Sequence, residues 1–108
     1  MYNEVIHLLS TRNVTNDVGD QIEERIETMR FAKIKSIGQS EFYQAQAAGF
    51  KPEIKFVLAD YLDYEYQQEL IYNGFRYKIL RTYRTEANEI EIVCYGGIRL
   101  ERVSNGNS

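Results

Sequence analysis

The 108-residue sequence has little of what most catalytic and metal-binding sites require: one cysteine, one histidine, one proline and no tryptophan. A single cysteine excludes an intramolecular disulfide and zinc or iron–sulfur sites with several cysteine ligands, and a single histidine excludes sites that need two imidazoles. No stretch approaches the run of about 18 apolar residues typical of a membrane-spanning helix. Residues 1–10 lack the pattern of a secretory signal. The length predicts one domain.

The chain also lacks a strong charge of either sign. Sixteen acidic and 13 basic side chains leave a net charge of −3, which argues against general attraction to nucleic acid or to an anionic membrane. The glycines show neither a dinucleotide-binding nor a phosphate-loop spacing. Cys94 and His7 fall in apolar stretches, so we expect a buried thiol and a packed or edge imidazole. We therefore expect no enzyme activity, no catalytic residue and no cofactor.

Aromatic residues are abundant instead, with nine tyrosines and five phenylalanines. Preference for β-strands explains most of them, although tyrosine also suits interfaces because it buries a ring while its hydroxyl stays in water. Tyr61, Tyr64 and Tyr66 are predicted to lie in a flexible or interfacial segment that binds partners. Four carboxylates lie beside them, at Asp60, Asp63, Glu65 and Glu69. A solvated acidic loop is preferred there over a divalent-cation site, because the spacing of a calcium-binding loop is missing.

Alternating apolar residues predict strands at 4–11, 25–37 and 53–59, with an exposed loop at 13–20. A helix over 21–30 is the alternative for part of the second strand. Residues 39–48 are rich in alanine, glutamine and glutamate and predict a helix. Ser40 is a candidate N-cap, and Gly49 is placed to end this helix.

Two hairpins are predicted after the helix. Asn73-Gly74 is a preferred two-residue turn, and it sets Tyr72 opposite Phe75 and Glu69 opposite Lys78. A second turn at residues 85–88 sets Arg84 opposite Glu89 and Ile79 opposite Cys94. In this register Arg81 falls on the apolar inner face, which requires a bulge or a position at the rim. Gly96-Gly97 is expected to end the strand, and residues 98–103 to form an edge strand or an arm.

These elements predict a mainly β fold, a small antiparallel β-barrel or sandwich of about six strands with one short inserted α-helix. The domain is expected to cover residues 1–103, followed by a flexible tail at 104–108.

The predicted hairpins carry several cations. The glutamates opposite Lys78 and Arg84 leave Arg76 as the least compensated cation of the outer face, and we take it as a partner-binding candidate. An acidic segment beside a basic strand suggests head-to-tail contact between subunits, a kind of contact that can close into rings. A basic, tyrosine-bearing hairpin also suits single-stranded nucleic acid, although the glutamates and the net charge count against that use.

Three segments in order resemble the small head–tail joining proteins of long-tailed phages, also called head-closure or stopper proteins. They are residues 32–45, which include Glu41-Phe42-Tyr43 followed by Ala45, then residues 50–54, and then residues 71–79. The resemblance spans about residues 2–95. The sequence departs from the family at residues 59–61, where relatives often have an arginine just before the aromatic residue.

The resemblance implies a β-barrel subunit of a ring below the portal and its adaptor, which closes the head after DNA packaging and provides the tail attachment surface. Such a protein assembles in the host bacterial cytoplasm and ends in the virion, at the head–tail interface. Its partners are the portal–adaptor ring, tail proteins and copies of itself. Double-stranded DNA passes without specific binding, and no membrane is involved.

The resemblance further implies that residues 38–55 lie near the channel, with Glu41, Phe42, Tyr43 and Ala45 as interface or gating candidates. A tail-completion or tail-terminator protein is the neighbouring alternative. A small-barrel protein that binds single-stranded nucleic acid is the alternative of another class.

Overall fold

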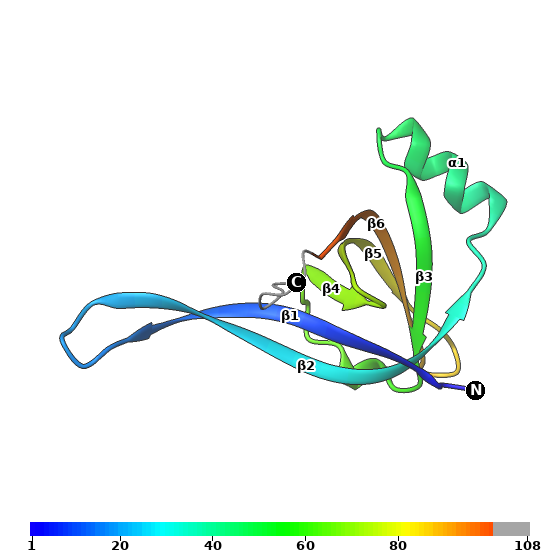
Figure 1. Ribbon diagram of the computed structural model, residues 1–108. Coiled ribbons are helices and arrows are strands. Elements are labelled where there is room, and N and C mark those ends of the chain that lie inside the picture. Colours follow the sequence, from blue (N-terminus) through cyan, green and yellow to red (C-terminus); the bar gives the residue numbers. More distant parts are fainter. Residues whose placement is uncertain (101–108) are drawn as a thin grey trace, which may run out of the picture.

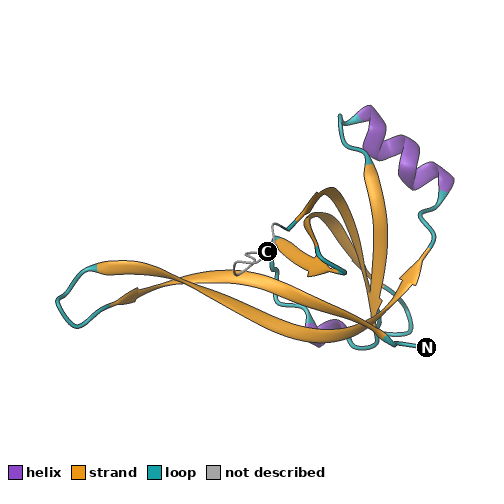
Figure 2. Cartoon of the chain, in the orientation of Figure 1, coloured by secondary structure: helices purple, strands orange, loops and turns teal. Residues whose placement is uncertain are grey.

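The structure, a computed structural model, describes residues 1–100 and forms a closed antiparallel barrel with the strand order β1-β2-β3-β6-β5-β4 (Figures 1 and 2). In chain order the elements are β1 (Glu4–Thr15), β2 (Gln21–Lys35), α1 (Gln39–Ala47), β3 (Pro52–Leu58), the 3₁₀ turn η1 (Tyr61–Asp63), β4 (Glu69–Tyr72), β5 (Phe75–Arg84) and β6 (Ile90–Arg99). The predicted mainly β fold with one short helix is confirmed, and the sheet closes as a barrel. The predicted strand residues 101–103 and the tail at 104–108 lie outside the described residues.

Within residues 1–100, no helix is both long enough and apolar enough to cross a membrane. The helix α1 begins at the predicted residue and ends one residue before the predicted end. Its N-cap is Gly38, with no side-chain cap, so Ser40 as the N-cap was wrong. Gly49 follows the helix with a φ of 90°, in the left-handed region that favours glycine, as predicted for its end.

The core fills the inside of the barrel with alternate residues of each strand. Its fully or almost fully buried large side chains are Ile6, Leu8, Phe56, Leu58, Leu70, Ile92 and Cys94. Each large apolar side chain buried in this way stabilises the fold by about 1.5–3 kcal/mol. Burial, together with the charge of Glu53, raises the pKa of the Cys94 thiol to about 12. The prediction of a buried, protonated cysteine is confirmed.

The first hairpin has the predicted register, with Tyr72 opposite Phe75 and Glu69 opposite Lys78. Asn73 and Gly74 take positive φ values of 52° and 82°, as this tight turn requires. The ion pair differs from the prediction, because Glu69 binds the diagonal neighbour Arg76, with Oε1 3.2 Å from Nε. A long arginine reaches across the diagonal of a ladder.

The predicted register of the second hairpin was wrong by one residue near its turn. Arg84 lies opposite Ile90, because Glu89 belongs to the loop and its carbonyl accepts the Thr85 N–H at 2.9 Å. A register shift between Ile79 and Arg81 then restores the predicted pairing of Ile79 with Cys94. The predicted bulge is therefore confirmed, and it brings Arg81 opposite Val93, away from the inner face.

Two glycines in β6 do not end the strand, contrary to prediction. β6 continues through Gly96 and Gly97 to Arg99, and Ile98 pairs with Arg76. The β5–β6 pairing has a second register shift here, between Arg76 and Lys78, and Gly96 takes a positive φ of 67° at this point. Glycine here marks a bulge in a continuous strand, which is a common use of glycine inside strands.

The strands β1 and β2 are longer than predicted and leave the barrel as a two-stranded ribbon (Figure 1). They pair from Glu4–Ala32 to Thr15–Gln21. The predicted loop at 13–20 was therefore wrong for residues 13–15, and so was the alternative helix at 21–30. β4 pairs with β1 only at residues 7–9, and β3 pairs with β2 only at residues 33–35. We call residues 10–26, which project past the barrel, the arm.

Candidate functional site

The four family-derived candidates lie on α1, which sits outside the barrel beside the start of β3 (Figure 1). Ala45 is the buried residue of this helix. Phe50, just after the helix, packs edge-to-face against Tyr95 with ring centroids 5.0 Å apart, and its N–H donates to the Ala45 carbonyl at 2.8 Å. The helix is thus attached to the barrel along one edge, with most of its surface in solvent.

An ionic cluster, here called the clamp, ties the first turn of α1 to the barrel wall. The Lys55 ammonium lies 2.9 Å from Glu41 Oε1 and 3.3 Å from Glu91 Oε1. The Arg81 guanidinium lies 4.0 Å from Glu41 Oε2, and its Nε and Nη2 have no hydrogen-bond partner among the described residues. The Lys55 side chain is only 7% exposed. The clamp therefore joins α1 to β3, β5 and β6 through charges largely removed from water.

The charges of the clamp hold each other ionised. Burial by itself lowers the pKa of Lys55, but the hydrogen bonds and charges of Glu41 and Glu91 outweigh it and raise that pKa above the ordinary lysine value. A hydrogen bond from Lys35 and the charge of Lys55 lower the pKa of Glu91, against the opposing effect of burial. Removing one partner from such a cluster costs about 3–5 kcal/mol, because the remaining charge is left buried and unpaired.

The candidates on α1 therefore differ in what their side chains contact. Glu41 and Ala45 attach the helix to its own barrel, whereas Tyr43 is 60% exposed and rests edge-on against Phe42, with ring centroids 6.2 Å apart. Sequence reasoning missed Lys55 as a partner of Glu41. A signal was present, since Lys55 interrupts the apolar run from Ile54 to Leu58.

Two of the three clustered tyrosines have a core position, contrary to prediction. Tyr61 and Tyr64 pack against the core cluster. The Tyr64 hydroxyl donates to the Gln67 carbonyl at 2.6 Å, and the Arg84 guanidinium stacks 3.7 Å from the centre of the Tyr61 ring. Only Tyr66 is a free surface ring, 85% exposed. The 3₁₀ turn η1 directs the first two rings inward, and the alternation of a strand does not reveal this.

The carboxylates near these tyrosines have separate partners. Asp60 caps η1 by accepting the Leu62 N–H at 2.9 Å, and Asp63 lies 3.9 Å from Arg30. In the described part of the chain, no three histidine, cysteine or acidic side chains are placed to hold a metal ion. Of these carboxylates, Asp63 and Glu69 thus lie near arginines of the same chain.

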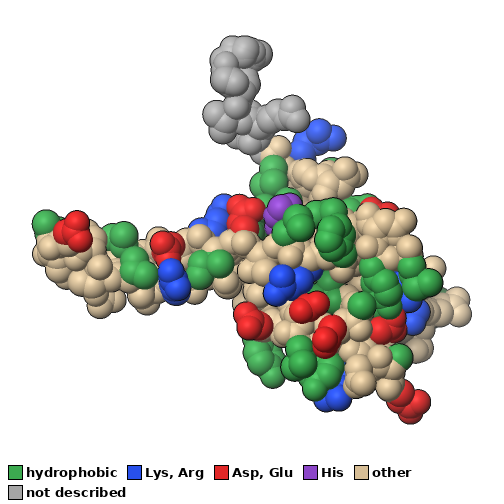
Figure 3. Space-filling view, turned by 90° about the horizontal axis from the view of Figure 1, so that it is seen from below, with side chains coloured by type: hydrophobic (Ala, Val, Ile, Leu, Met, Phe, Trp, Pro, Cys, Tyr) green, Lys and Arg blue, Asp and Glu red, His purple; other side chains and the backbone are tan. Residues whose placement is uncertain are grey.

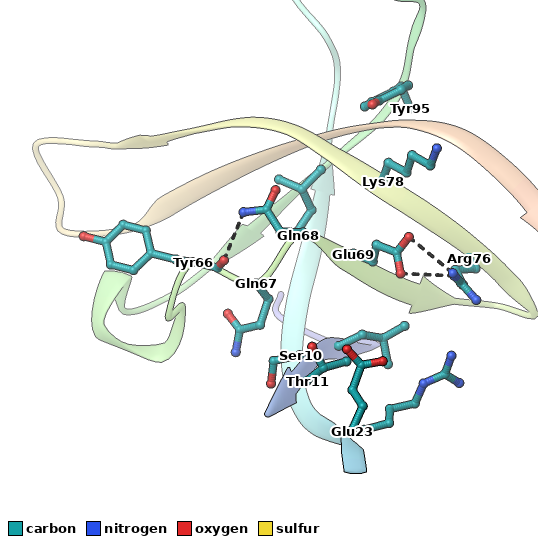
Figure 4. Close-up of a pocket in the computed structure, with 13 residues that line it drawn as sticks. Ser10, Thr11, Glu23, Tyr66, Gln67, Gln68, Glu69, Arg76, Lys78 and Tyr95 are labelled. Atoms are coloured by element: carbon teal, nitrogen blue, oxygen red, sulfur yellow. Dashed lines mark hydrogen bonds and ion pairs between the residues drawn. The ribbon is translucent and has the colours of Figure 1, made fainter. Parts of the chain in front are cut away.

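A polar cavity of about 570 Å³, here called the groove, lies where the arm leaves the barrel (Figure 4). Its walls come from the base of the arm, residues 66–69, β5 and β6. Arg76 lines it, already paired with Glu69, as the dashed lines in Figure 4 mark. The prediction that Arg76 is the least compensated cation was therefore wrong. Lys78, also in the groove, is exposed and has no ion pair among the described residues.

An apolar patch, here called the outer patch, covers the outside of β1 and β2 and consists of Val5, Met29 and Phe31. Val5 lies directly opposite Phe31, and Met29 opposite His7. Phe31 is 58% exposed and Met29 49%. Figure 3 shows this side, with hydrophobic side chains flanking the single histidine. Contiguous exposed apolar side chains of this kind mark interaction surfaces.

Comparison with known proteins assigns no family. No protein-family model matches the chain, and no curated protein matches it. The functional interpretation depends on the sequence motifs and on the geometry described above.

Proposed function

We propose that this chain is a structural virion protein, a head-closure subunit of the head–tail connector ring of a tailed phage or prophage. It docks under the portal–adaptor complex, retains the packaged DNA and provides the tail attachment surface. One observation carries the proposal: a small barrel presents the arm, α1 and the outer patch on its outside, and each leaves apolar side chains exposed. Surfaces of this kind are completed by partners.

The way in which α1 is attached to the barrel supports a role at the channel. The helix has nine residues and is too short to be stable alone. It is held mainly by the clamp and by Ala45, so loss of the clamp frees it without dismantling the barrel core. In the proposed ring, this segment lies next to the channel and presents Tyr43 to a neighbour.

The charge of the chain supports passage of DNA without binding. B-DNA carries one negative charge about every 1.7 Å along its axis. A subunit with a net charge of −3 avoids general attraction to it. Several cations of the predicted basic hairpin are also occupied, because Arg76 pairs with Glu69 and Arg84 covers Tyr61. This arrangement weakens the alternative of a single-stranded nucleic-acid binder, whose cations must be free to contact phosphates.

The proposal is tested by mixing the purified chain with portal–adaptor rings from the same genome and imaging them by negative stain. We expect an added layer of density below the adaptor. The variant Phe31→Glu, which places a charge on the outer patch, is expected to abolish the layer. The matched control Ala87→Glu adds the same charge on an exposed turn and should leave the layer in place.

Two outcomes contradict the proposal. If the wild-type chain adds no layer to the rings, head closure is wrong. If it instead binds single-stranded DNA at low salt, and changing Arg76 and Lys78 to alanine abolishes that binding, the nucleic-acid alternative replaces it. A layer that forms only on tail tubes supports the tail-completion or tail-terminator alternative.

A further inference from the structure

The tip of the arm, Asn16–Asp20, is an ordered acidic turn with one exposed apolar side chain. The Asn16 side-chain oxygen accepts the N–H groups of Val18 and Asp20 at 3.1 and 2.9 Å. This turn presents Val18, 79% exposed, between the exposed carboxylates of Asp17 and Asp20. Neither carboxylate has an ion pair among the described residues. The tip is therefore a preformed apolar knob with two free negative charges.

Behind the tip, one cross-strand pair of the arm is apolar and uncovered, next to the Arg12–Glu24 ion pair on the same face. Val14 lies opposite Ile22, on the face that continues the inside of the barrel outward. Ile22 is 46% exposed, because no strand packs over this part of the ribbon. A two-stranded hairpin alone is marginally stable in water. The apolar pair Val14/Ile22 is thus left without a covering layer in the single chain.

The groove has the complementary chemistry. Arg25, Arg76 and Lys78 line it, against the carboxylates of Glu23 and Glu69, of which Glu69 is neutralised by Arg76. Leu9 and Ile79 contribute apolar surface to the same cavity. A smaller adjoining cavity shares Arg76 and Lys78 and adds the exposed apolar side chains of Ile98 and Leu100. An acidic tip with an apolar knob fits this surface in both charge and polarity.

The tip does not reach the groove of its own chain. β1 continues six residues beyond Leu9, to Thr15, which corresponds to about 20 Å of extended strand. The ribbon points away from the barrel along this length (Figure 1). Among the described residues the tip of the same chain is therefore out of reach of the groove, and a second copy of this chain carries a tip of this chemistry.

We propose that the tip of the arm of one copy docks into the groove of a second copy. The tip and the groove are different surfaces, so each copy donates one and accepts one. Contacts of this head-to-tail kind generate rings when the rotation closes. Ring closure rests on the proposed function, whereas the contact itself rests on the chemistry of the tip and the groove.

Engineered cysteines test the contact in the full chain at high protein concentration. The native Cys94 is fully buried, with a raised pKa, and leaves new cysteines as the reactive ones. With oxidised glutathione added as the oxidant, we expect Val18→Cys on one tagged copy to form a disulfide with Gln68→Cys, in the groove, on a differently tagged copy. The matched control replaces Gln68→Cys by Gln46→Cys on α1, which is also exposed and should not be linked.

Charge reversal provides a second test that does not depend on cysteine geometry. In the Val18→Cys background, Asp17→Lys is expected to lower the yield of the Gln68 disulfide about two- to fivefold, the range for one exposed ion pair. Lys78→Glu on the accepting copy should restore it. Glu86→Lys, an equal charge change on the β5–β6 turn, serves as the control and should leave the yield unchanged.

The contact is overturned if Val18→Cys links to Gln46→Cys as readily as to Gln68→Cys, if it forms no disulfide with either, or if Lys78→Glu fails to restore the yield. These failures are distinct from failure of the proposed function. If the chain forms the Gln68 disulfide but adds no layer to portal–adaptor rings, the contact is supported and head closure is wrong. If the chain adds the layer without forming the disulfide, head closure is supported and the contact is wrong.

Discussion

Gly97 on β6 lies directly against the ring of Tyr77 on β5. A Cβ atom at Gly97 would be 2.6 Å from Tyr77 Cε1 and 2.9 Å from Glu53 Oε1. The Gly97 N–H donates to the same Glu53 oxygen at 3.0 Å. Tyr77 packs against the core, so its ring has little freedom to move away. β6 passes this close because residue 97 has no side chain.

Replacing Gly97 by alanine is therefore expected to lower the free energy of unfolding by about 1–3 kcal/mol, the usual cost of forcing a methyl group into a packed site. Urea unfolding measures the change. Gly38→Ala is the comparison at an uncrowded glycine, because a Cβ there has no neighbour within 4 Å and φ is −66°; as an N-cap change it should cost only about 0.5 kcal/mol. A Gly97→Ala variant as stable as the wild type would show that the Gly97–Tyr77 contact yields without cost.

Substitutions of the clustered tyrosines are expected to differ in their effect on the free energy of unfolding. Tyr64→Ser removes a ring packed on the core and the hydrogen bond to Gln67, and should cost about 2 kcal/mol or more. Tyr66→Ser changes an exposed ring and should stay within about 0.5 kcal/mol of the wild type. Thermal unfolding of both variants checks the difference. A stable Tyr64→Ser variant would return this ring to the interface candidates.

Breaking the clamp is expected to release α1. Glu41→Gln removes the charge nearest Lys55 and leaves the ammonium and Arg81 without their shared partner. Amide hydrogen exchange of residues 39–47 should then speed up, while that of the barrel strands stays slow. Gln46→Ala, on the exposed part of the same helix, is the control. Unchanged exchange in Glu41→Gln would mean that Ala45 and Phe50 suffice to hold the helix.

Stability is expected to fall in acid through Glu91. The hydrogen bond from Lys35 holds the pKa of Glu91 below its ordinary value of 4.5, so the unfolded chain binds a proton more readily than the folded one. Its contribution is present above pH 4.5 and is lost as the pH falls below that value. Urea unfolding at several pH values gives the free energy of unfolding as a function of pH, and Glu91→Gln should reduce its fall below pH 4.5. Glu86→Gln, on an exposed turn, should leave that fall as steep as in the wild type.

Local sequence signals predicted the elements whose causes are local. The Asn73-Gly74 turn set the first register because positive φ at both positions allows few other pairings. The composition of residues 39–48 predicted α1. Arg81, an arginine on an apolar row, correctly required a bulge. In the second turn Asn88 takes a φ of 64° and Glu89 joins the loop, which shifted the register by one residue.

The arm was missed because its outer residues have no barrel neighbour. Residues 13–15 are polar or β-branched, and their pattern fits a loop as well as a strand whose two faces meet solvent. Pairing with residues 21–23 across the ribbon decides between the two, and that pairing depends on the register of the whole β1–β2 ladder. Periodicity indicates burial, so it says little about a strand outside the core.

The sequence by itself determined a small, mainly β domain with one inserted helix, a buried cysteine and one tight hairpin. Turn chemistry, helix propensity and alternation act over a few neighbouring residues, and they are legible without a structure. Only the tertiary structure decided that Glu41 meets Lys55, that Glu69 binds Arg76, that Tyr61 and Tyr64 face inward and that the arm leaves the barrel beside the groove. These relations join residues from different strands, and the closure of the barrel determines which side chains come within reach of one another.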